Sequence, residues 1–251
     1  MTDRASLPSF FALVALDQID STNEEALRRA RAGAPEGTFV WARAQTGGRG
    51  RRGRAWSSPP GNLYVSLLLR PGVPPADAAQ LGFVAAVAMA ETLGTVLPPE
   101  RRLSCKWPND LLVDGAKVAG ILPEAEAAGR NVEALVLGIG INMVSYPPDT
   151  PYPATSLQAA GARLTLEALL EALADRLLFW YRRWQEAGFA PIRVRWLDFA
   201  AGVGQPIEVR LEGATLRGRF AALDTTGALD LELPDGNHRL VTAGDVFYPA
   251  A

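Results

Sequence analysis

The sequence predicts an α+β fold in which helices flank a mixed β-sheet, followed by a small β-barrel. Up to residue 199, segments with helical spacing alternate with short runs rich in valine, leucine and aromatic residues. After residue 199 only short alternating segments remain, and glycines separate them. We therefore predict one large domain at residues 1–199 and a small one at residues 200–251.

Three segments of the large domain are predicted helices. The first runs from Ser21 to Gly33, and its serine stands three residues before Glu24, as in a capping box. Residues 76–97 are apolar at helical spacing. Residues 166–186 carry one stripe of leucines and tryptophans, which we interpret as core packing.

The predicted strands are short runs bounded by glycine, proline or turn residues. They cover residues 38–44, 63–69, 103–106, 111–113, 118–123 and 132–141 in the large domain, and 207–211, 216–223, 229–233 and 239–243 in the barrel.

Composition excludes several classes of protein. Of the 251 residues 48% are hydrophobic, and the net charge of −2 provides no general basic field for nucleic acid. The single Cys105 cannot form an internal disulfide, and with His238 it leaves too few ligands for a structural zinc site. The apolar stretch at residues 10–16 is too short to span a bilayer and lacks an export signal. We expect a cytoplasmic protein without a membrane anchor.

The segment from Gln45 to Arg54 contains four arginines and four glycines in ten residues. Glycine raises the entropic cost of ordering and the arginines repel one another, so an anion would stabilise this loop. Guanidinium groups and exposed backbone amides suit phosphate or carboxylate. The loop matches neither a Walker A motif nor a dinucleotide fingerprint. An exposed RNA-binding tract is the alternative reading.

Two further motifs point to the same chemistry. Lys106-Trp-Pro-Asn-Asp110 and Lys117 would place two cations at the mouth of one hairpin, where they could hold a phosphate beside a carboxylate. The alternative is a plain turn with solvated lysines. Gly138-Ile-Gly-Ile-Asn142 ends an apolar strand, and glycine in a strand marks close approach of a ligand or of another backbone, so we expect these glycines to line the pocket, with simple packing as the alternative.

These motifs together resemble those of bacterial biotin protein ligases. The resemblance rests on Ser21-Thr-Asn23, Gln45 with GRGRRG, Trp56, KWPND, Lys117 with AGIL, GIGIN and ATSL, in the order and approximate spacing of that family. It covers residues 20 to 160 and extends more weakly into the barrel. It implies a sheet related to the catalytic domains of class II aminoacyl-tRNA synthetases, followed by an SH3-like barrel.

The resemblance also implies roles for individual residues. Biotin would be bound by Ser21, Thr22, Asn23, Gln45, Arg49, Gly50, Arg51, Lys117, Gly138 and Gly140, with the ureido ring at Ser21, Thr22 and Gln45. ATP or the adenylate would be bound by Arg51, Arg52, Trp56, Lys106, Asn109 and Asn142. Mg²⁺ would accompany the ATP phosphates, and Asp110 is a candidate contact for it.

The implied reaction converts biotin and ATP to biotinyl-5′-AMP and pyrophosphate, then transfers biotin to a lysine of a biotin carboxyl carrier domain. The first step joins two anions, so charge and alignment dominate its barrier. Arg49, Arg51, Lys106 and Lys117 are the predicted catalytic cations, and the loop would cover the reactive anhydride.

Only about twenty residues precede Ser21, too few for a DNA-binding domain, so we expect a ligase that is not a repressor. A lipoate or octanoyl transfer enzyme and an RNA-binding module are the rival functions. A homodimer is compatible with the sequence.

Overall fold

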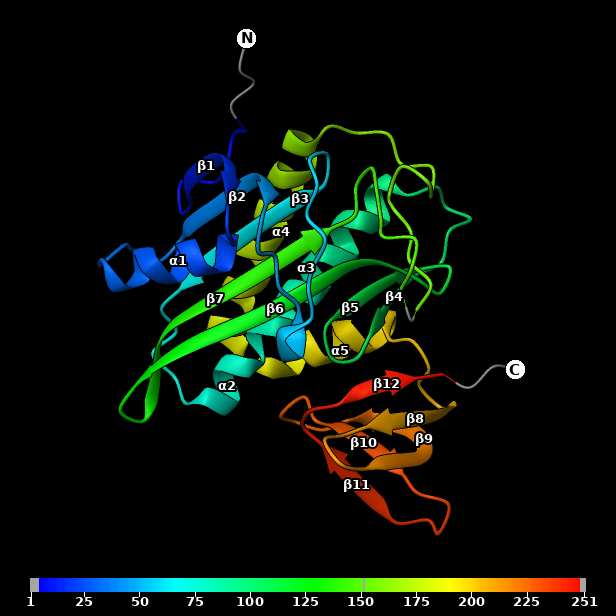
Figure 1. The fold of residues 1–251 in the computed structure, drawn as a ribbon. Helices are drawn as coiled ribbons and strands as arrows, with labels where there is room; N and C mark the ends of the chain where they lie inside the picture. The colour runs from blue at the N-terminus through cyan, green and yellow to red at the C-terminus, as the bar shows by residue number, and fades with distance from the viewer. Residues whose placement is uncertain (1–4, 151, 249–251) are drawn as a thin grey trace.

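The computed structural model describes residues 5–150 and 152–248, and its larger part is built on one seven-stranded sheet (Figure 1). The strand order is β1-β2-β3-β7-β6-β5-β4. Only β1 and β2 run parallel, and the other neighbours are antiparallel. The mixed sheet is therefore confirmed. The bounds are β1 (Ala12–Ile19), β2 (Thr38–Gln45), β3 (Leu63–Leu69), β4 (Leu103–Lys106), β5 (Asp110–Val113), β6 (Ala116–Ala128) and β7 (Asn131–Ile141).

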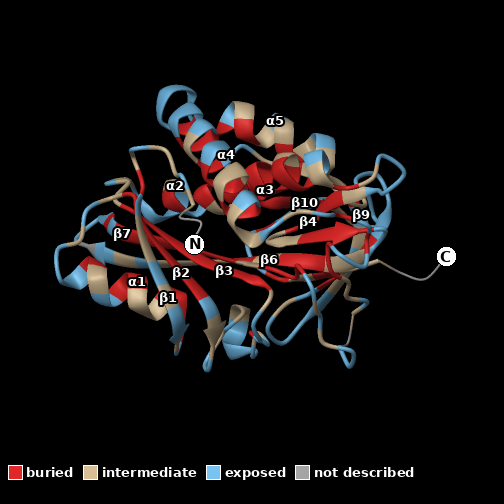
Figure 2. Cartoon of the chain, turned by 90° about the horizontal axis from the view of Figure 1, so that it is seen from above, coloured by how far each residue is buried: buried red, intermediate tan, exposed pale blue. Residues whose placement is uncertain are grey.

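Helices cover both faces of this sheet (Figure 2). Helix α1 (Thr22–Arg31) packs on β2, β3 and β7. On the opposite face lies α3 (Leu81–Val96), which α4 (Leu166–Ala187) and α5 (Phe189–Phe199) cover in turn. Because protein surrounds α3, that helix is apolar on all sides. The segment from Pro75 to Val96 is long and apolar enough to cross a membrane, but most of it is buried in this core.

The C-terminal part is a five-stranded antiparallel sheet in the order β11-β10-β9-β8-β12. Its strands are β8 (Pro206–Arg210), β9 (Thr215–Leu223), β10 (Leu229–Glu232), β11 (His238–Val241) and β12 (Asp245–Phe247). It packs closely on the larger part, since Trp107 Nε1 donates to the Gly227 carbonyl at 3.1 Å. A Cβ on Gly227 would lie 2.7 Å from the Phe83 ring, so this contact excludes a larger residue.

Three elements escaped prediction, each for a physical reason. Strand β1 lies at the sheet edge and alternates irregularly between exposed and half-buried residues. Helix α5 has Pro191 in its first turn, where proline is tolerated but obscures the helical pattern. Strand β12 has only three residues. It adds a fifth strand to the predicted four.

Two predictions about helices were wrong in detail. Residues 76–97 do not form one helix, because α2 (Pro75–Ala79) and α3 are separated at Gln80, whose side chain accepts a hydrogen bond from Trp184. Ser21 is the N-cap of α1, but its side chain makes no capping hydrogen bond. The Glu24 carboxylate does not close a capping box either, because it pairs with Arg49.

Candidate functional site

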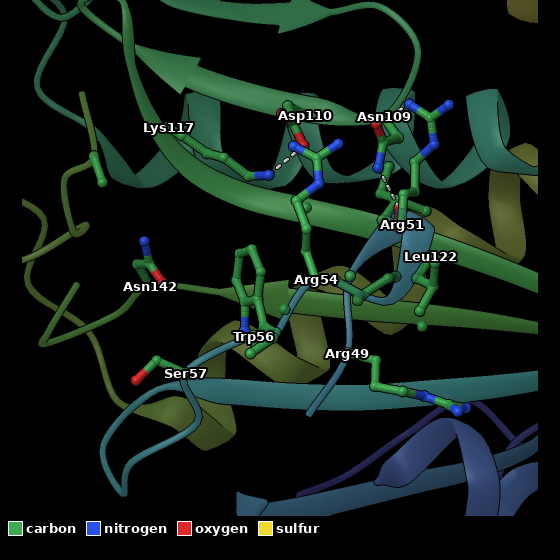
Figure 3. Close-up of a pocket in the computed structure, with 18 of the residues that line it drawn as sticks. Arg49, Arg51, Arg54, Trp56, Ser57, Asn109, Asp110, Lys117, Leu122 and Asn142 are labelled. Carbon is green, nitrogen blue, oxygen red and sulfur yellow. Dashed lines mark hydrogen bonds and ion pairs between the residues drawn. The ribbon is translucent and has the colours of Figure 1, made fainter. Parts of the chain in front are cut away.

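A cavity of about 240 Å³ lies on the α1 face of the sheet, between that helix, the arginine loop and the C-terminal sheet (Figure 3). Its walls come from segments that are far apart in the sequence. They are the start of α1, the loop after β2, the turn between β4 and β5, strands β6 and β7, the segment after β7, and β12.

The floor of the cavity at the α1 end is a buried polar network. Gln45 Oε1 accepts hydrogen bonds from the Thr22 amide at 2.8 Å and from the Thr22 hydroxyl at 3.1 Å. Ser66 Oγ, which is fully buried, lies 2.8 Å from Thr22 Oγ1 and 2.6 Å from Asn23 Oδ1. Gln45 Nε2 donates to Ser58 Oγ at 2.9 Å. These side chains hold one another in place without a ligand.

The strand glycines make room for side chains of this chain. A Cβ on Gly138 would lie 2.2 Å from Asn23 Oδ1, and one on Gly140 would lie 2.7 Å from the Trp56 indole. Gly120 and Gly140 are paired across β6 and β7, so the Trp56 indole packs on backbone atoms that no side chain covers. Both predicted glycines line the cavity, but Asn23 and Trp56 occupy the space directly above them.

The arginine loop is held by carboxylates at both ends. Arg49 points toward α1, where it pairs with Glu24 and lies 3.4 Å from Glu124 (Figure 3). At the other end Arg54 Nη2 lies 2.7 Å from Asp245 Oδ2 in β12. Arg52 Nη1 lies 3.4 Å from the same oxygen. The arginines are therefore paired around a cavity, which does not favour an exposed RNA-binding tract.

Arg51 is the loop arginine that is most enclosed. Its Nη1 donates to the Gly244 carbonyl at 3.1 Å and to Asn109 Oδ1 at 3.3 Å. Burial lowers the pKa of the Arg51 guanidinium, while the Asp245 carboxylate opposes that shift.

The two lysines lie on separate strands with β5 between them, and not at the mouth of one hairpin. Lys117 Nζ, at the start of β6, lies 2.5 Å from Asp110 Oδ1 and 5.2 Å from the Trp56 ring. Lys106 Nζ, at the end of β4, lies 4.5 Å from the centre of the Tyr152 ring and 5.7 Å from that of Phe247.

The pKa of the Lys106 ammonium is lowered. Burial lowers the pKa of its ammonium below the usual lysine value, the Asp110 carboxylate raises that pKa, and the Lys117 ammonium lowers it further. The aromatic rings replace part of the water that Lys106 loses.

Two amide side chains that line the cavity are fixed by backbone carbonyls. Asn142 Nδ2 donates to the Thr155 carbonyl at 3.0 Å, and Asn109 Nδ2 donates to that of Ile121 at 2.7 Å. Among the described residues, buried Trp56 Nε1 has no acceptor. The nitrogen faces strand β7, where a Cβ on Gly140 would lie 2.7 Å from it.

The cavity brings together every predicted site residue except Arg52. Arg52, which adopts a positive φ of 55°, does not line the cavity itself and pairs with the lining residue Asp245, so its predicted contact with the nucleotide stays a prediction. The prediction missed Arg54, Ser57, Tyr152 and Asp245. Arg54 and Ser57 flank predicted residues and could have been included. Tyr152 and Asp245 lie in segments without a motif.

The chemistry of this site is that of an anion-binding cavity. It offers ammonium and guanidinium groups at one end and neutral hydrogen-bonding groups at the other. Among the residues that the structure describes, no three histidine, cysteine or carboxylate side chains are grouped as metal ligands. Asp110, the candidate for Mg²⁺, is engaged with Lys117. A magnesium ion would fit here only if phosphates and water supplied most of its ligands.

Comparison with known proteins identifies the family. The model of the biotin/lipoate A/B protein ligase family matches residues 15–142, and that of the biotin protein ligase C terminal domain matches residues 202–248. The chain therefore belongs to the biotin/lipoate A/B protein ligase family.

Within this family the chain is similar to biotin ligases in particular. It is 42% identical to the biotin–acetyl-CoA-carboxylase ligase of Paracoccus denitrificans, covering 93% of this chain and 99% of that protein. It is 36% identical to the bifunctional ligase/repressor of Bacillus subtilis, covering 92% of this chain and 72% of that protein. The solved biotin protein ligase of Aquifex aeolicus in complex with biotin and ATP has a TM-score of 0.80 at 28% identity, covering 94% of this chain and 97% of that one. The fold that the sequence predicted is confirmed.

Proposed function

We propose that this chain is a biotin protein ligase, which activates biotin with ATP to biotinyl-5′-AMP and pyrophosphate and transfers biotin to a lysine of a carrier protein. One observation carries the proposal. Arg51, Lys106 and Lys117 converge on a cavity whose opposite end is a preformed polar floor. A molecule with a neutral polar head and a carboxylate at the other end matches this distribution of charge.

The polar floor suits the ureido ring of biotin. That ring presents one carbonyl acceptor and two N–H donors, which hydroxyl and amide groups can satisfy. The Ser21 hydroxyl makes no capping bond to α1 and lines the cavity together with Gln45. Because Thr22 and Ser58 fix the Gln45 side chain, the amide needs no rearrangement when biotin binds.

The cations suit the first chemical step. A carboxylate oxygen of biotin attacks the α-phosphorus of ATP, the bond to the β-phosphate oxygen breaks, and pyrophosphate leaves. Lys117 would hold the carboxylate, while Lys106 and Arg51 would offset charge on the phosphates. No proton is transferred in this step, so no general base is required. In the second step the neutral lysine amine of the carrier attacks the acyl carbon, the bond from that carbon to the AMP phosphate oxygen breaks, and the nitrogen loses a proton to solvent as AMP leaves.

Three further assignments rest on this chemistry. Mg²⁺ would supply charge neutralisation on the phosphates, while the protein contributes its lysines and arginines. The acceptor would be the biotin carboxyl carrier domain of a carboxylase, since the relative from Paracoccus denitrificans is a biotin–acetyl-CoA-carboxylase ligase. The single cysteine, buried and unpaired, is compatible with the reducing cytoplasm.

The decisive experiment is biotin-dependent exchange of labelled pyrophosphate into ATP, followed by transfer of biotin to a purified carrier domain. Lipoate and octanoate serve as competing acids in the same assay. We expect exchange with biotin alone. Exchange that requires lipoate or octanoate would contradict the assignment of biotin, and the absence of exchange with any acid would contradict adenylate formation.

A further inference from the structure

Glu124 on strand β6 contacts both the polar floor and the arginine loop, which belong to separate sequence motifs. Its Oε2 accepts a hydrogen bond from Asn23 Nδ2 at 2.7 Å, and its Oε1 lies 3.4 Å from Arg49 Nη2. Asn23 belongs to the polar floor, and Arg49 to the beginning of the arginine loop. One carboxylate therefore contacts the floor and the loop at once.

Asn23 is not free to serve a ligand with its N–H groups. Its two amide protons are directed to Glu124 and to the Leu122 carbonyl, at 2.7 and 3.1 Å. Its Oδ1 lies 2.6 Å from Ser66 Oγ, and it stands over Gly138, where no larger residue fits. Asn23 thus acts as a connector inside the protein, with its side chain 4% exposed.

From Asn23 the hydrogen bonds continue to the segment that follows the loop. Ser66 connects Asn23 to Thr22, Thr22 donates to Gln45, and Gln45 donates to Ser58. Ser58 Oγ then donates to the Trp56 carbonyl at 2.9 Å. Arg49 and Trp56 lie on the two sides of the base of the loop, where the Trp56 amide donates to the Gly48 carbonyl at 2.9 Å. The network that begins at Glu124 therefore supports both sides of that base.

The geometry points to Glu124 as a positioning residue that couples closure of the arginine loop to the polar floor on which the ureido ring is proposed to lie. This inference rests on the proposed function. Glu124 touches neither of the reacting groups and acts through Arg49 and Asn23. Disturbing it should therefore weaken the binding of biotin and loosen the loop, while the nucleotide end stays intact.

Two substitutions separate the contacts of Glu124. Glu124→Gln keeps an oxygen that can accept from Asn23 but removes the charge that attracts Arg49. Glu124→Ala removes both contacts. The matched control is Glu126→Gln, because Glu126 lies two residues further on the same strand and pairs with Arg31 of α1, away from the cavity. Glu24→Gln removes a carboxylate that contacts Arg49 without touching Asn23.

Two measurements on the full chain test the coupling. The first is the KM for biotin and for ATP in pyrophosphate exchange. For Glu124→Ala we expect the KM for biotin to rise about tenfold, as for loss of a charge-assisted hydrogen bond, with the KM for ATP changed less than about twofold. Glu124→Gln should lie between this variant and the parent, and Glu126→Gln should match the parent.

The second measurement is the rate at which trypsin cuts after the loop arginines, followed by mass spectrometry, and it does not depend on ligase activity. We expect faster cutting in Glu124→Ala and Glu124→Gln than in Glu126→Gln. Glu24→Gln should also be cut faster, but its KM for biotin should stay closer to that of the parent. Should the two Glu124 variants match Glu126→Gln in both measurements, or raise both KM values equally, the coupling is refuted. If the parent shows no exchange, the proposed function fails, and the trypsin result alone still decides whether Glu124 holds the loop.

Discussion

The two ends of the cavity are built in different ways. At the α1 end, Thr22, Asn23 and Ser66 are buried and are held by hydrogen bonds that are neutral apart from the one from Asn23 to the Glu124 carboxylate. At the other end, Lys117 and Arg54 are partly exposed and are held by carboxylates, Asp110 and Asp245. The first end is fixed by packing. The second is held by charge pairs, which anionic substrates can replace.

This difference has an energetic meaning. A buried neutral network is costly to disturb, because every displaced donor or acceptor loses its partner away from water. Exposed ion pairs each contribute little, so exchanging one anionic partner for another costs little as well. We infer that the α1 end determines which acid is bound, and that the cationic end adapts as the phosphates enter and leave.

The largest expected effect comes from breaking the fixed end. In Gly138→Val the new side chain would overlap Asn23, because even a Cβ would lie 2.2 Å from its Oδ1. We expect biotin-dependent pyrophosphate exchange to fall about 100-fold or more, as for a misplaced binding group. The control is Gly94→Ala in α3, whose Cβ would have no contact closer than 4.0 Å. Normal exchange in Gly138→Val would show that the floor is adaptable.

The next effect concerns Lys106. Lys106→Met should lower the exchange rate about 100-fold, by analogy with loss of one donor that stabilises developing negative charge. Because burial lowers the pKa of Lys106, the parent should lose activity with rising pH earlier than an ordinary lysine would dictate. Lys106→Arg, which keeps its charge, should shift this alkaline limb upward. An unchanged pH profile in Lys106→Arg would exclude Lys106 as its source.

A smaller effect is expected for Arg51. Arg51→Ala removes the contacts to Asn109 and Gly244 and one of the cations proposed to offset charge on the phosphates, so retention of biotinyl-adenylate should weaken about tenfold. A filter-retention assay measures this directly. If the variant holds the intermediate as tightly as the parent, Arg51 does not cover it.

The smallest effect is predicted for the ion pairs at the C-terminal sheet. Asp245→Asn frees Arg52 and Arg54, and loss of such partly exposed pairs should speed release of the adenylate by about two- to fivefold. Asp230→Asn, in the same sheet but paired with His238, is the matched control. An effect as large as that of Gly138→Val would mean that the two ends of the cavity do not differ as described.

The sequence predicted elements well where one local signal dominated. Strand β3 has the predicted bounds, because six of its seven residues are hydrophobic and all seven are buried, on both faces of the sheet. The capping box failed because Glu24 has a better partner in Arg49, a residue 25 positions away. The spacing of neighbouring residues in the sequence cannot show that a distant arginine binds the carboxylate in place of the helix N-terminus.

The candidate site shows the same limit. Motifs located the loop arginines and both lysines, because such groups of cationic residues can be recognised in the amino-acid sequence itself. The partners of these cations were not predictable, since Asp245 and Tyr152 reach the cavity only through the packing of the C-terminal sheet and of the segment after β7. Glu124 was overlooked because it stands between apolar strand residues and belongs to no motif.

Strand β12 has a consequence for engineering this chain. Its three residues supply the counter-ion for the loop arginines and one of the rings that enclose Lys106. A truncation before residue 245, made to obtain a smaller labelling reagent, would thus remove both the carboxylate that pairs with the loop arginines and a ring that shields Lys106 from water. A minimal version should therefore retain the last strand or graft an equivalent acidic and aromatic pair onto the shortened end.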